Sequence, residues 1–326
     1  MLKRIFFVLG GVLAVFILVL VIFPEVRQAI LGVRLVKDVP AGRLEPVSVV
    51  SMLMCAREMR GYSGEINFNM DDDVQPDVYD YAANLVESVS QGGNEPIVNY
   101  EIKEEKFAQV GANKPNLMVK NLYSLRLQPS GVLAGLELLR GRHSKLYDGV
   151  RMAQLLSPLW LAKPNKRVYL GQVWDGNYKL DYSLATLGKS EITLDHRLKY
   201  KLEEITSDNG MDLAKISYNG SIVVSPKEDC GPNIKIAGQG HIEGVAMLNL
   251  RSGSVVLADD RTAWGLVVRF IDKEVEDVNL FDRKSRIFRP LYVRNAGENF
   301  SSAMPSEGEG MADIHQMDKK KDGAKR

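Results

Sequence analysis

The chain has 326 residues, of which 45% are hydrophobic and 25% charged, as in an ordinary globular protein large enough for a sizeable core. Forty-two Lys and Arg residues balance 41 Asp and Glu residues, so no overall positive field would attract nucleic acid or acidic substrates. The two cysteines, Cys55 and Cys230, lie far apart and in no CxxC motif, which excludes a zinc cluster or a disulfide-dense scaffold. A single bridge between them would need an oxidising compartment and stays open.

Residues 5–23, IFFVLGGVLAVFILVLVIF, form an apolar stretch without a charge. Its length matches the ~20 residues that cross a bilayer core and exceeds that of a typical signal-peptide core. No small-x-small cleavage site follows, so we predict a retained transmembrane helix. Basic residues on both flanks leave the positive-inside rule undecided: Lys3, Arg4, Arg27, Arg34 and Lys37. The short N-terminal tail and the β-rich region downstream favour a single-pass inner-membrane protein with the bulk of the chain in the periplasm.

The region after the predicted anchor contains two segments that we expect to be helical. Residues Ser48–Met59 are apolar-rich, and Val78–Val89 show helical spacing of apolar residues. Between them an acidic stretch contains Asp71, Asp72, Asp73 and Asp77. Because this stretch lacks the D-x-D-x-D-G spacing of a calcium loop, we interpret it as a solvated turn and predict no metal site.

Strand patterning dominates from Ile97 to Ile271. Apolar and polar residues alternate there in several runs, which is typical of strands with one dry and one wet face. The Asn209-Gly210 pair between two such runs predicts a hairpin. The residues expected on the dry face include Tyr123, Leu125, Leu127, Tyr178, Leu180, Tyr182, Leu184, Leu198, Tyr200, Leu202, Ala214, Ile216, Tyr218, Ile222, Val224, Ile234, Ile236, Ile242, Trp264, Leu266, Val268 and Phe270.

An apolar helix is predicted within Ser144–Ala162, interrupted by Pro158, and it would cover the dry face of the sheet. Four glycines stand on that face in place of large side chains: Gly220, Gly238, Gly240 and Gly244. Glycines weaken strands but permit close approach. Either a helix or an apolar ligand would therefore fill the shallow channel that they line.

The order of segments in the second half of the predicted domain resembles that of uncharacterised bacterial envelope β-domains. The segments are, in turn, PSGVLAGLELL, the apolar helix, PNKRVYLGQVW, a KYKLEEITSDNGMDLAKISYNGSI hairpin and AGQGHIEGVAMLNLRSGSV. Those domains are similar in architecture to the lipoprotein-carrier half-barrel. The resemblance spans about residues 117–270 and implies a curved sheet with a capacity for an apolar ligand. It attaches no catalytic residue to Val168, Gly171 or Trp174. The chain departs from lipoproteins because Cys55 follows Met54 and stands in no lipobox.

No catalytic constellation is found. His241 and Glu243 share one strand face but stand beside Lys235 and Gln239, which is typical of a solvated ladder. The neighbours Asp195 and His196 would point to opposite faces of a strand; the two other histidines are His143 and His315. The glycines of AGQGHIEG do not match a phosphate-binding loop, and no serine stands in G-x-S-x-G. We therefore predict no enzyme, no catalytic residue, no metal and no cofactor, and leave any ligand-binding residues unassigned.

Trp174, between Gly171 and Gly176, is interpreted as a packing residue that closes the end of the core. The predicted fold is mainly β (α+β), a curved antiparallel sheet or half-barrel covered by a helix. Its parts are a membrane anchor (1–24), a juxtamembrane helical linker (25–60), a β-rich envelope domain (61–290) and a disordered polar tail (291–326). We predict a non-catalytic envelope protein that binds a partner protein or serves as an assembly subunit. The alternative is a carrier of lipid or another apolar ligand.

Overall fold

The computed structural model describes residues 32–35, 44–61, 65–71, 73–92, 95–110, 116–117, 121–127, 133–142, 149–183, 191–208, 210–227 and 232–289. The predicted anchor, the polar tail, Cys230, His143 and His315 lie outside these ranges. Within them, no helix is both long and apolar enough to span a membrane.

A single antiparallel sheet of 12 strands makes up most of the described chain, in the order β6-β5-β3-β2-β1-β12-β11-β10-β9-β8-β7, with β4 paired to β3. The strands are β1 (Leu44–Gly61), β2 (Asp77–Gly92), β3 (Glu95–Gln109), β4 (Asn116–Leu117), β5 (Leu122–Leu127), β6 (Leu133–Arg140), β7 (Val173–Ser183), β8 (Glu191–Asp208), β9 (Met211–Pro226), β10 (Ile234–Asn249), β11 (Val255–Phe270) and β12 (Val275–Phe288). Helix α3 (Gly149–Leu156) and two short 3-10 segments, η1 (Ser157–Leu159) and η3 (Ile271–Lys273), complete the described elements.

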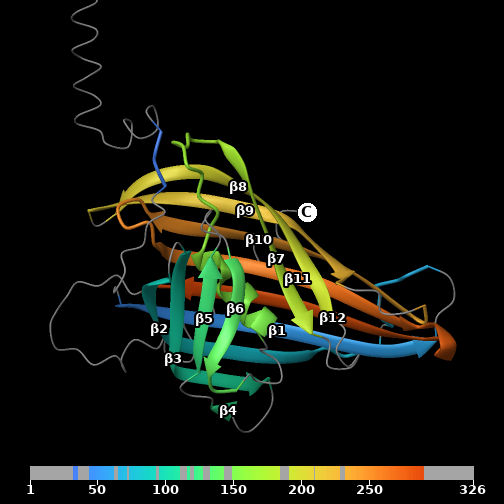
Figure 1. Ribbon diagram of the computed structural model, residues 1–326. Coiled ribbons are helices and arrows are strands. Elements are labelled where there is room, and N and C mark those ends of the chain that lie inside the picture. The colour runs from blue at the N-terminus through green and yellow to red at the C-terminus, as the bar shows by residue number, and fades with distance from the viewer. Residues whose placement is uncertain are drawn as a thin grey trace, which may run out of the picture.

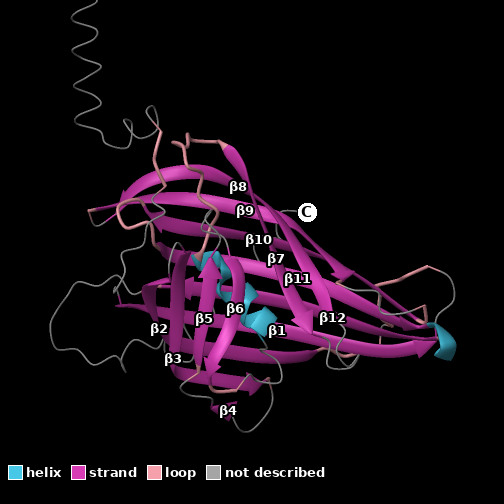
Figure 2. Ribbon diagram, viewed as in Figure 1, coloured by secondary structure: helices cyan, strands magenta, loops and turns pink. Residues whose placement is uncertain are grey.

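The sheet curls until its edge strands β6 and β7 lie near each other, so the fold approaches a closed barrel (Figure 1). Helix α3 lies inside the curve and contacts both edge strands (Figure 2). Its Met152, Leu155 and Leu156 are fully buried, and each such side chain stabilises the fold by roughly 1.5–3 kcal/mol. The mainly β antiparallel architecture is therefore confirmed, and the predicted helix is present as the short α3, which lies against the edge strands on the inner face.

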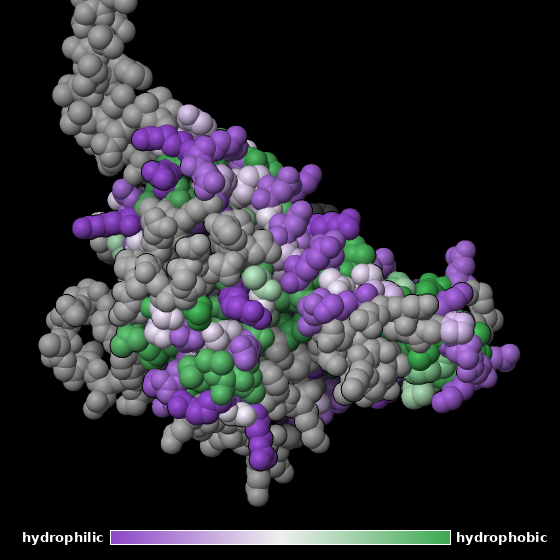
Figure 3. All heavy atoms as spheres, in the orientation of Figure 1, coloured by the Kyte–Doolittle hydropathy of each residue, from purple (hydrophilic) through white to green (hydrophobic). Residues whose placement is uncertain are grey.

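The inner face of the sheet carries the apolar residues that the alternation predicts. Leu198, Tyr200 and Leu202 on β8 are buried between exposed or half-buried neighbours, and Ile216 and Tyr218 on β9 repeat the pattern. The hairpin between β8 and β9 turns at Gly210, whose φ is +76°. On the outside, hydrophilic residues cover much of the face seen in Figure 3, with a hydrophobic patch over β5 and β6.

The two helices predicted before residue 97 are wrong, because Ser48–Met59 and Val78–Val89 lie in strands β1 and β2. β1 is central, paired with β2 and β12, and its residues 47–51 are all buried. A strand covered on both faces reads as a continuous apolar run, which periodicity alone cannot distinguish from a buried helix. The sheet therefore begins at Leu44, within the segment predicted as a helical linker.

The glycine-lined channel on the inner face is filled by side chains from neighbouring strands: Leu198 beside Gly220, Val224 beside Gly238, and aromatic residues beside Gly240 and Gly244. Gly240 pairs with Trp264 and Gly244 with Tyr218, and a Cβ at either glycine would collide with its partner's side chain. Aromatic residues commonly cover cross-strand glycines in this way. The glycines thus make room for neighbouring side chains rather than for a ligand.

Trp174 closes one end of this core, as predicted. Its indole Nε1 donates a hydrogen bond to the Ala162 carbonyl at 2.7 Å, and its ring stacks on Tyr200 with centroids 5.9 Å apart. Gly176 is required nearby because a Cβ there would meet Ala162 and the Tyr200 ring.

A buried charge network ties the end of β12 to the opposite half of the sheet. The Arg289 guanidinium donates to Glu87 at 2.8 Å and pairs with Glu45 at 2.8 Å. Tyr100 donates to the same Glu87 carboxylate and accepts a bond from Trp160 Nε1 at 2.6 Å. Because a buried charge is costly without partners, these residues fix the segment after α3 against β2 and β3.

Candidate binding groove

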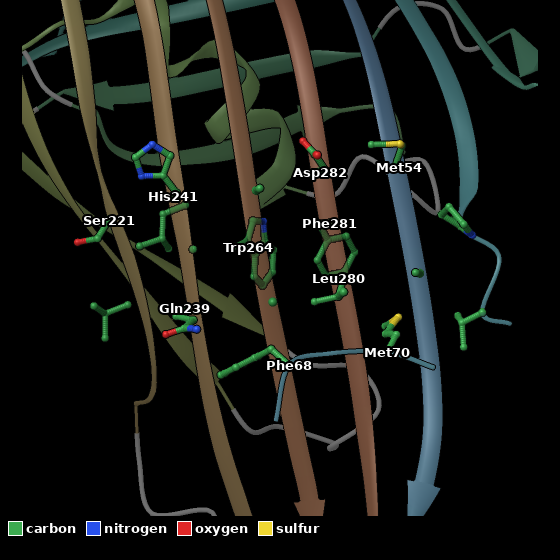
Figure 4. A pocket seen from close by; sticks show the side chains of 18 residues that line it. Met54, Phe68, Met70, Ser221, Gln239, His241, Trp264, Leu280, Phe281 and Asp282 are labelled. Carbon is green, nitrogen blue, oxygen red and sulfur yellow. The ribbon is translucent and has the colours of Figure 1, made fainter. Parts of the chain in front are cut away.

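A groove of about 790 Å³ lies on the outer face of the sheet and spans β9, β10, β11, β12 and β1 (Figure 4). Two rows of directly paired residues run across it, and their apolar members form its floor. The first row is Ser221, His241, Ala263, Asp282 and Met54; the second is Val223, Gln239, Gly265, Leu280 and Ala56. We call this site the outer-face groove.

Small side chains in the middle of both rows create the hollow. Ala263, Gly265 and Ala56 add little volume to the outer face, whereas residues at the rim are larger. The ring of Phe68 lies over Gly265, since a Cβ on that glycine would stand 3.1 Å from Phe68 Cδ1. A depression with an apolar floor therefore runs across the strands.

Residues 65–71, here called the strap, border the groove with Phe68 and Met70. Two arginines of the sheet hold its backbone. Arg60 donates to the carbonyls of Asn67 at 2.9 Å and Asn69 at 2.6 Å, and Arg269 donates to the carbonyl of Glu65 at 2.5 Å. The strap is consequently positioned by charge-assisted hydrogen bonds, which are stronger than neutral ones.

The Glu276 carboxylate orients both of these arginines. It accepts from Arg60 Nε at 2.8 Å and from Arg269 Nε at 2.9 Å. Burial acts to raise the pKa of Glu276, but the bonds from Arg269 and Arg60 outweigh it and leave that pKa below its ordinary value. Glu276 thus stays ionised, and the strap keeps its place at neutral pH.

Polar groups stand at the rim of the apolar floor. Asp282 is paired with Arg261 by two hydrogen bonds of 3.0 and 2.5 Å, while the His241 side chain is largely exposed. An apolar concavity with a few polar groups is the usual form of a binding site, and its volume lies in the range of roughly 300–1,000 Å³ for ligand pockets. The groove can bury an apolar side chain or chain segment and offer hydrogen bonds along its edge.

The titratable residues singled out in the sequence lie in different places. His241 is at the groove rim, with Nε2 3.8 Å from Glu243 Oε2 and both side chains exposed. His196 points into the core while Asp195 faces outward to Arg197, as predicted for strand neighbours. Asp77 accepts a bond from Gln109. Among the described residues, no three His, Cys, Asp or Glu side chains gather as metal ligands would, and Asp72 lies outside them.

The inner face next to α3 leaves a cavity of only about 10 Å³, bordered by Leu53, Gln154 and Trp264. That volume is about enough for one water molecule. The same region holds the buried ion pair of Asp260 and Arg283, 2.6 Å apart, and Thr262. The inner face is therefore packed at this point, whereas the outer face is open.

The residues that form the groove were not predicted. Val223 precedes Val224 on β9, so one of two consecutive valines must face outward, and Val223 is 38% exposed. In the strap, apolar Phe68 and Met70 alternate with asparagines. Both patterns indicate an apolar outer surface. The pairing of five strands in the folded sheet is what brings Val223 and the strap to the same groove.

No protein-family model and no curated protein sequence matches the chain. A comparison of structures finds the crystal structure of OccK11 (OpdR) from Pseudomonas aeruginosa, 7% identical, with 79% of this chain and 100% of that chain covered and a TM-score of 0.16. A likeness of this size carries no argument about fold or function.

Proposed function

We propose that the protein is a non-catalytic envelope protein, anchored once in the inner membrane by residues 5–23, whose β-domain binds a partner protein. The outer-face groove is the single observation that supports this proposal most. Its apolar floor, its polar rim and its open side suit a segment of a partner chain, which would place side chains on the floor and backbone groups at the rim.

The fixed strap supports binding rather than catalysis. A ligand that meets a preformed groove does not have to order it first, which improves affinity. The titratable groups at the rim are either exposed or paired: His241 lies near Glu243, and Asp282 is bonded to Arg261. This arrangement gives no nucleophile with an adjacent base, as a covalent mechanism would need.

The volume of the groove favours a second candidate, a lipid or other apolar small molecule. The resemblance to envelope β-domains of carrier architecture points the same way. The proposed carrier would hold its ligand in the outer-face groove and not in the inner channel, whose glycines are covered by Trp264 and Tyr218.

Two exposed valines on the outer face provide a matched test. Val223 lies on the groove floor, and Val245, equally exposed at 36% against 38%, lies on the neighbouring strand outside the groove. Val223→Asp would bury an unpaired carboxylate under the partner and weaken binding at least about tenfold, whereas Val245→Asp would not. A photoreactive amino acid at each position, incorporated in the native host, would show which one crosslinks.

Three outcomes are distinct. The partner-binding proposal is supported if a protein crosslinks from position 223 and not from position 245, and if that protein no longer co-purifies with the Val223→Asp variant. A lipid-sized adduct in native mass spectrometry, lost in the same variant, supports the carrier instead. Equal crosslinking from both positions, with no adduct, contradicts both. An activity of the purified chain abolished by changing His241 or Glu243 would contradict the non-catalytic proposal.

A further inference from the structure

The segment at Gly32–Leu35 enters the domain beside the turn that precedes β7. Val33 and Val168 exchange two backbone hydrogen bonds of 2.8 Å, and Arg167 Nη1 donates to the Gly32 carbonyl at 3.1 Å. A Cβ on Gly32 would stand 3.0 Å from the ring of Tyr169. The two segments lie together at one end of the molecule in Figure 1.

This turn exposes three large apolar side chains within five residues. Tyr169 is 49%, Leu170 51% and Val173 52% exposed. Isolated exposed apolar residues are common, but a cluster of them marks a contact surface. Lys166 and Arg167, both exposed, stand directly before the cluster.

The turn is rigid. Gln172 N donates to the Tyr169 carbonyl at 2.9 Å, and Gly171 N donates to the Leu202 carbonyl at 2.7 Å. Gly171 has a φ of +77°, which a type II turn requires at its third residue and which favours glycine there. Leu170 is thereby held at the tip, away from the sheet.

We infer that this turn is a membrane-contact site, in which Tyr169, Leu170 and Val173 enter the headgroup region of the bilayer and Lys166 and Arg167 bind anionic lipid headgroups. The inference rests on the proposed anchor. Only residues 24–31 separate the apolar stretch 5–23 from Gly32, and eight residues span no more than about 30 Å in any conformation. The turn beside Gly32 then lies within about 30 Å of the point where the anchor leaves the bilayer core, within reach of the bilayer surface.

The chemistry of the turn suits a membrane surface. Tyrosine is enriched at membrane–water interfaces, where its ring is in apolar surroundings and its hydroxyl is hydrated. Basic residues near an anionic leaflet are attracted to it over a Debye length. The contact would also set the orientation of the domain, and hence of the outer-face groove, relative to the membrane.

The test uses the full chain in vesicles of phosphatidylethanolamine and phosphatidylglycerol that contain brominated lipid, which quenches tryptophan emission at short range. Tyr169→Trp places a reporter in the turn. Met59→Trp is the matched control, because Met59 is 63% exposed at the opposite end of the sheet on β1. The emission of each variant is corrected for the three native tryptophans with the unchanged chain.

We expect quenching of the Tyr169→Trp reporter to exceed that of the Met59→Trp reporter by at least about twofold, since only an interfacial side chain lies within reach of the lipid bromines. Equal quenching in chains that float with the vesicles overturns the contact and leaves the anchor intact. Chains that fail to float overturn the anchor and this inference together. Adding Lys166→Glu to the Tyr169→Trp chain should reduce the quenching of the turn reporter. Lys235→Glu, at an exposed site on β10, is the control and should not reduce it. Equal effects of the two changes would overturn the proposed binding of anionic headgroups by the turn.

Discussion

His196 is a buried neutral imidazole that the fold holds for packing. It is fully buried, stacks on Tyr178 with ring centroids 4.2 Å apart, and has its Nε2 atom 3.0 Å from Gln154 Nε2. Burial lowers the pKa of His196 from 6.5 to about 3, because the interior does not solvate a charged ring. Cys55 on β1 is similar, since burial raises the pKa of its thiol to about 11 and makes it unreactive.

The depressed pKa of His196 predicts a loss of stability in acid. Below pH 6.5 the unfolded chain binds a proton at this residue, while the folded chain does not until pH about 3. The free energy of unfolding therefore decreases as the pH falls through this window, by about 1.4 kcal/mol per pH unit from His196 alone. Denaturant unfolding at several pH values should show a flatter slope for His196→Gln. His241→Gln, at an exposed histidine, should keep the slope of the unchanged chain, and identical slopes for all three chains would contradict the prediction.

The strap shows how one element depends on a few side chains. Its backbone is bonded to Arg60 and Arg269, and both arginines are oriented by Glu276. The side chains of the strap are themselves half-buried or exposed, and its Asp71 N donates a longer bond of 3.4 Å to Glu58 Oε2. The shape of the groove therefore depends on Glu276, which orients both arginines, and on Glu58, which also accepts from Arg60 at 3.2 Å.

Replacing Glu276 by Gln should loosen the strap without unfolding the sheet. Two guanidinium groups would lose their charged acceptor, at a cost of about 3 kcal/mol or more for a buried pair. Amide hydrogen exchange should accelerate in residues 65–71, while the central strands stay protected. Asp259→Asn, which breaks a half-exposed pair with Arg286, is the control and should change exchange in the strap little. Unchanged exchange in Glu276→Gln would show that other contacts hold the strap.

Two glycines of β10 belong to the same scale, because Gly240 and Gly244 each face an aromatic residue on a paired strand. Gly244→Leu should overpack the core against Tyr218 and destabilise the protein by ~1–3 kcal/mol. Gly135→Leu on β6 is the control, since a Cβ there meets nothing within 4 Å. The midpoint of urea unfolding should be lower for Gly244→Leu than for Gly135→Leu. Equal midpoints would mean that the inner channel can accommodate a leucine side chain.

The described part of the chain forms a nearly closed barrel that is packed next to α3 and has an open groove on its outer face. The buried network of Glu87 and Arg289 joins the two halves of the sheet, so the barrel is expected to unfold as one unit. This compact body would be presented to other envelope components by the proposed anchor.

At this scale we predict that the domain faces the periplasm. An alkaline phosphatase fused after residue 326 should be active, because that enzyme needs disulfides that form outside the cytoplasm. A cytoplasm-only reporter at the same position should be inactive, and its activity would refute the orientation. The same location bears on a Cys55–Cys230 bridge, since a reducing compartment would leave both thiols free.

The amino-acid sequence by itself determined the features that depend on near neighbours. Alternation of apolar and polar residues on β8 and β9 follows from the two-residue period of a strand, and the Asn209-Gly210 hairpin follows from local turn geometry. The opposite directions of Asp195 and His196 follow from the same period. The predicted anchor, too, depends only on the run of residues 5–23.

Only the tertiary structure decided what each face of the sheet meets. β1 and β2 have helix-like apolar spacing, but their place among paired strands makes them strands, because long-range pairing overrides local propensity. Whether Gly240 lines a cavity or a ring depends on Trp264 across the register, 24 residues later in the chain. The outer-face groove likewise exists because Gly265 on β11, two residues from Ala263, falls in line with Ala56 on β1 across the intervening strand β12, and that register is a property of the folded sheet and not of any local segment.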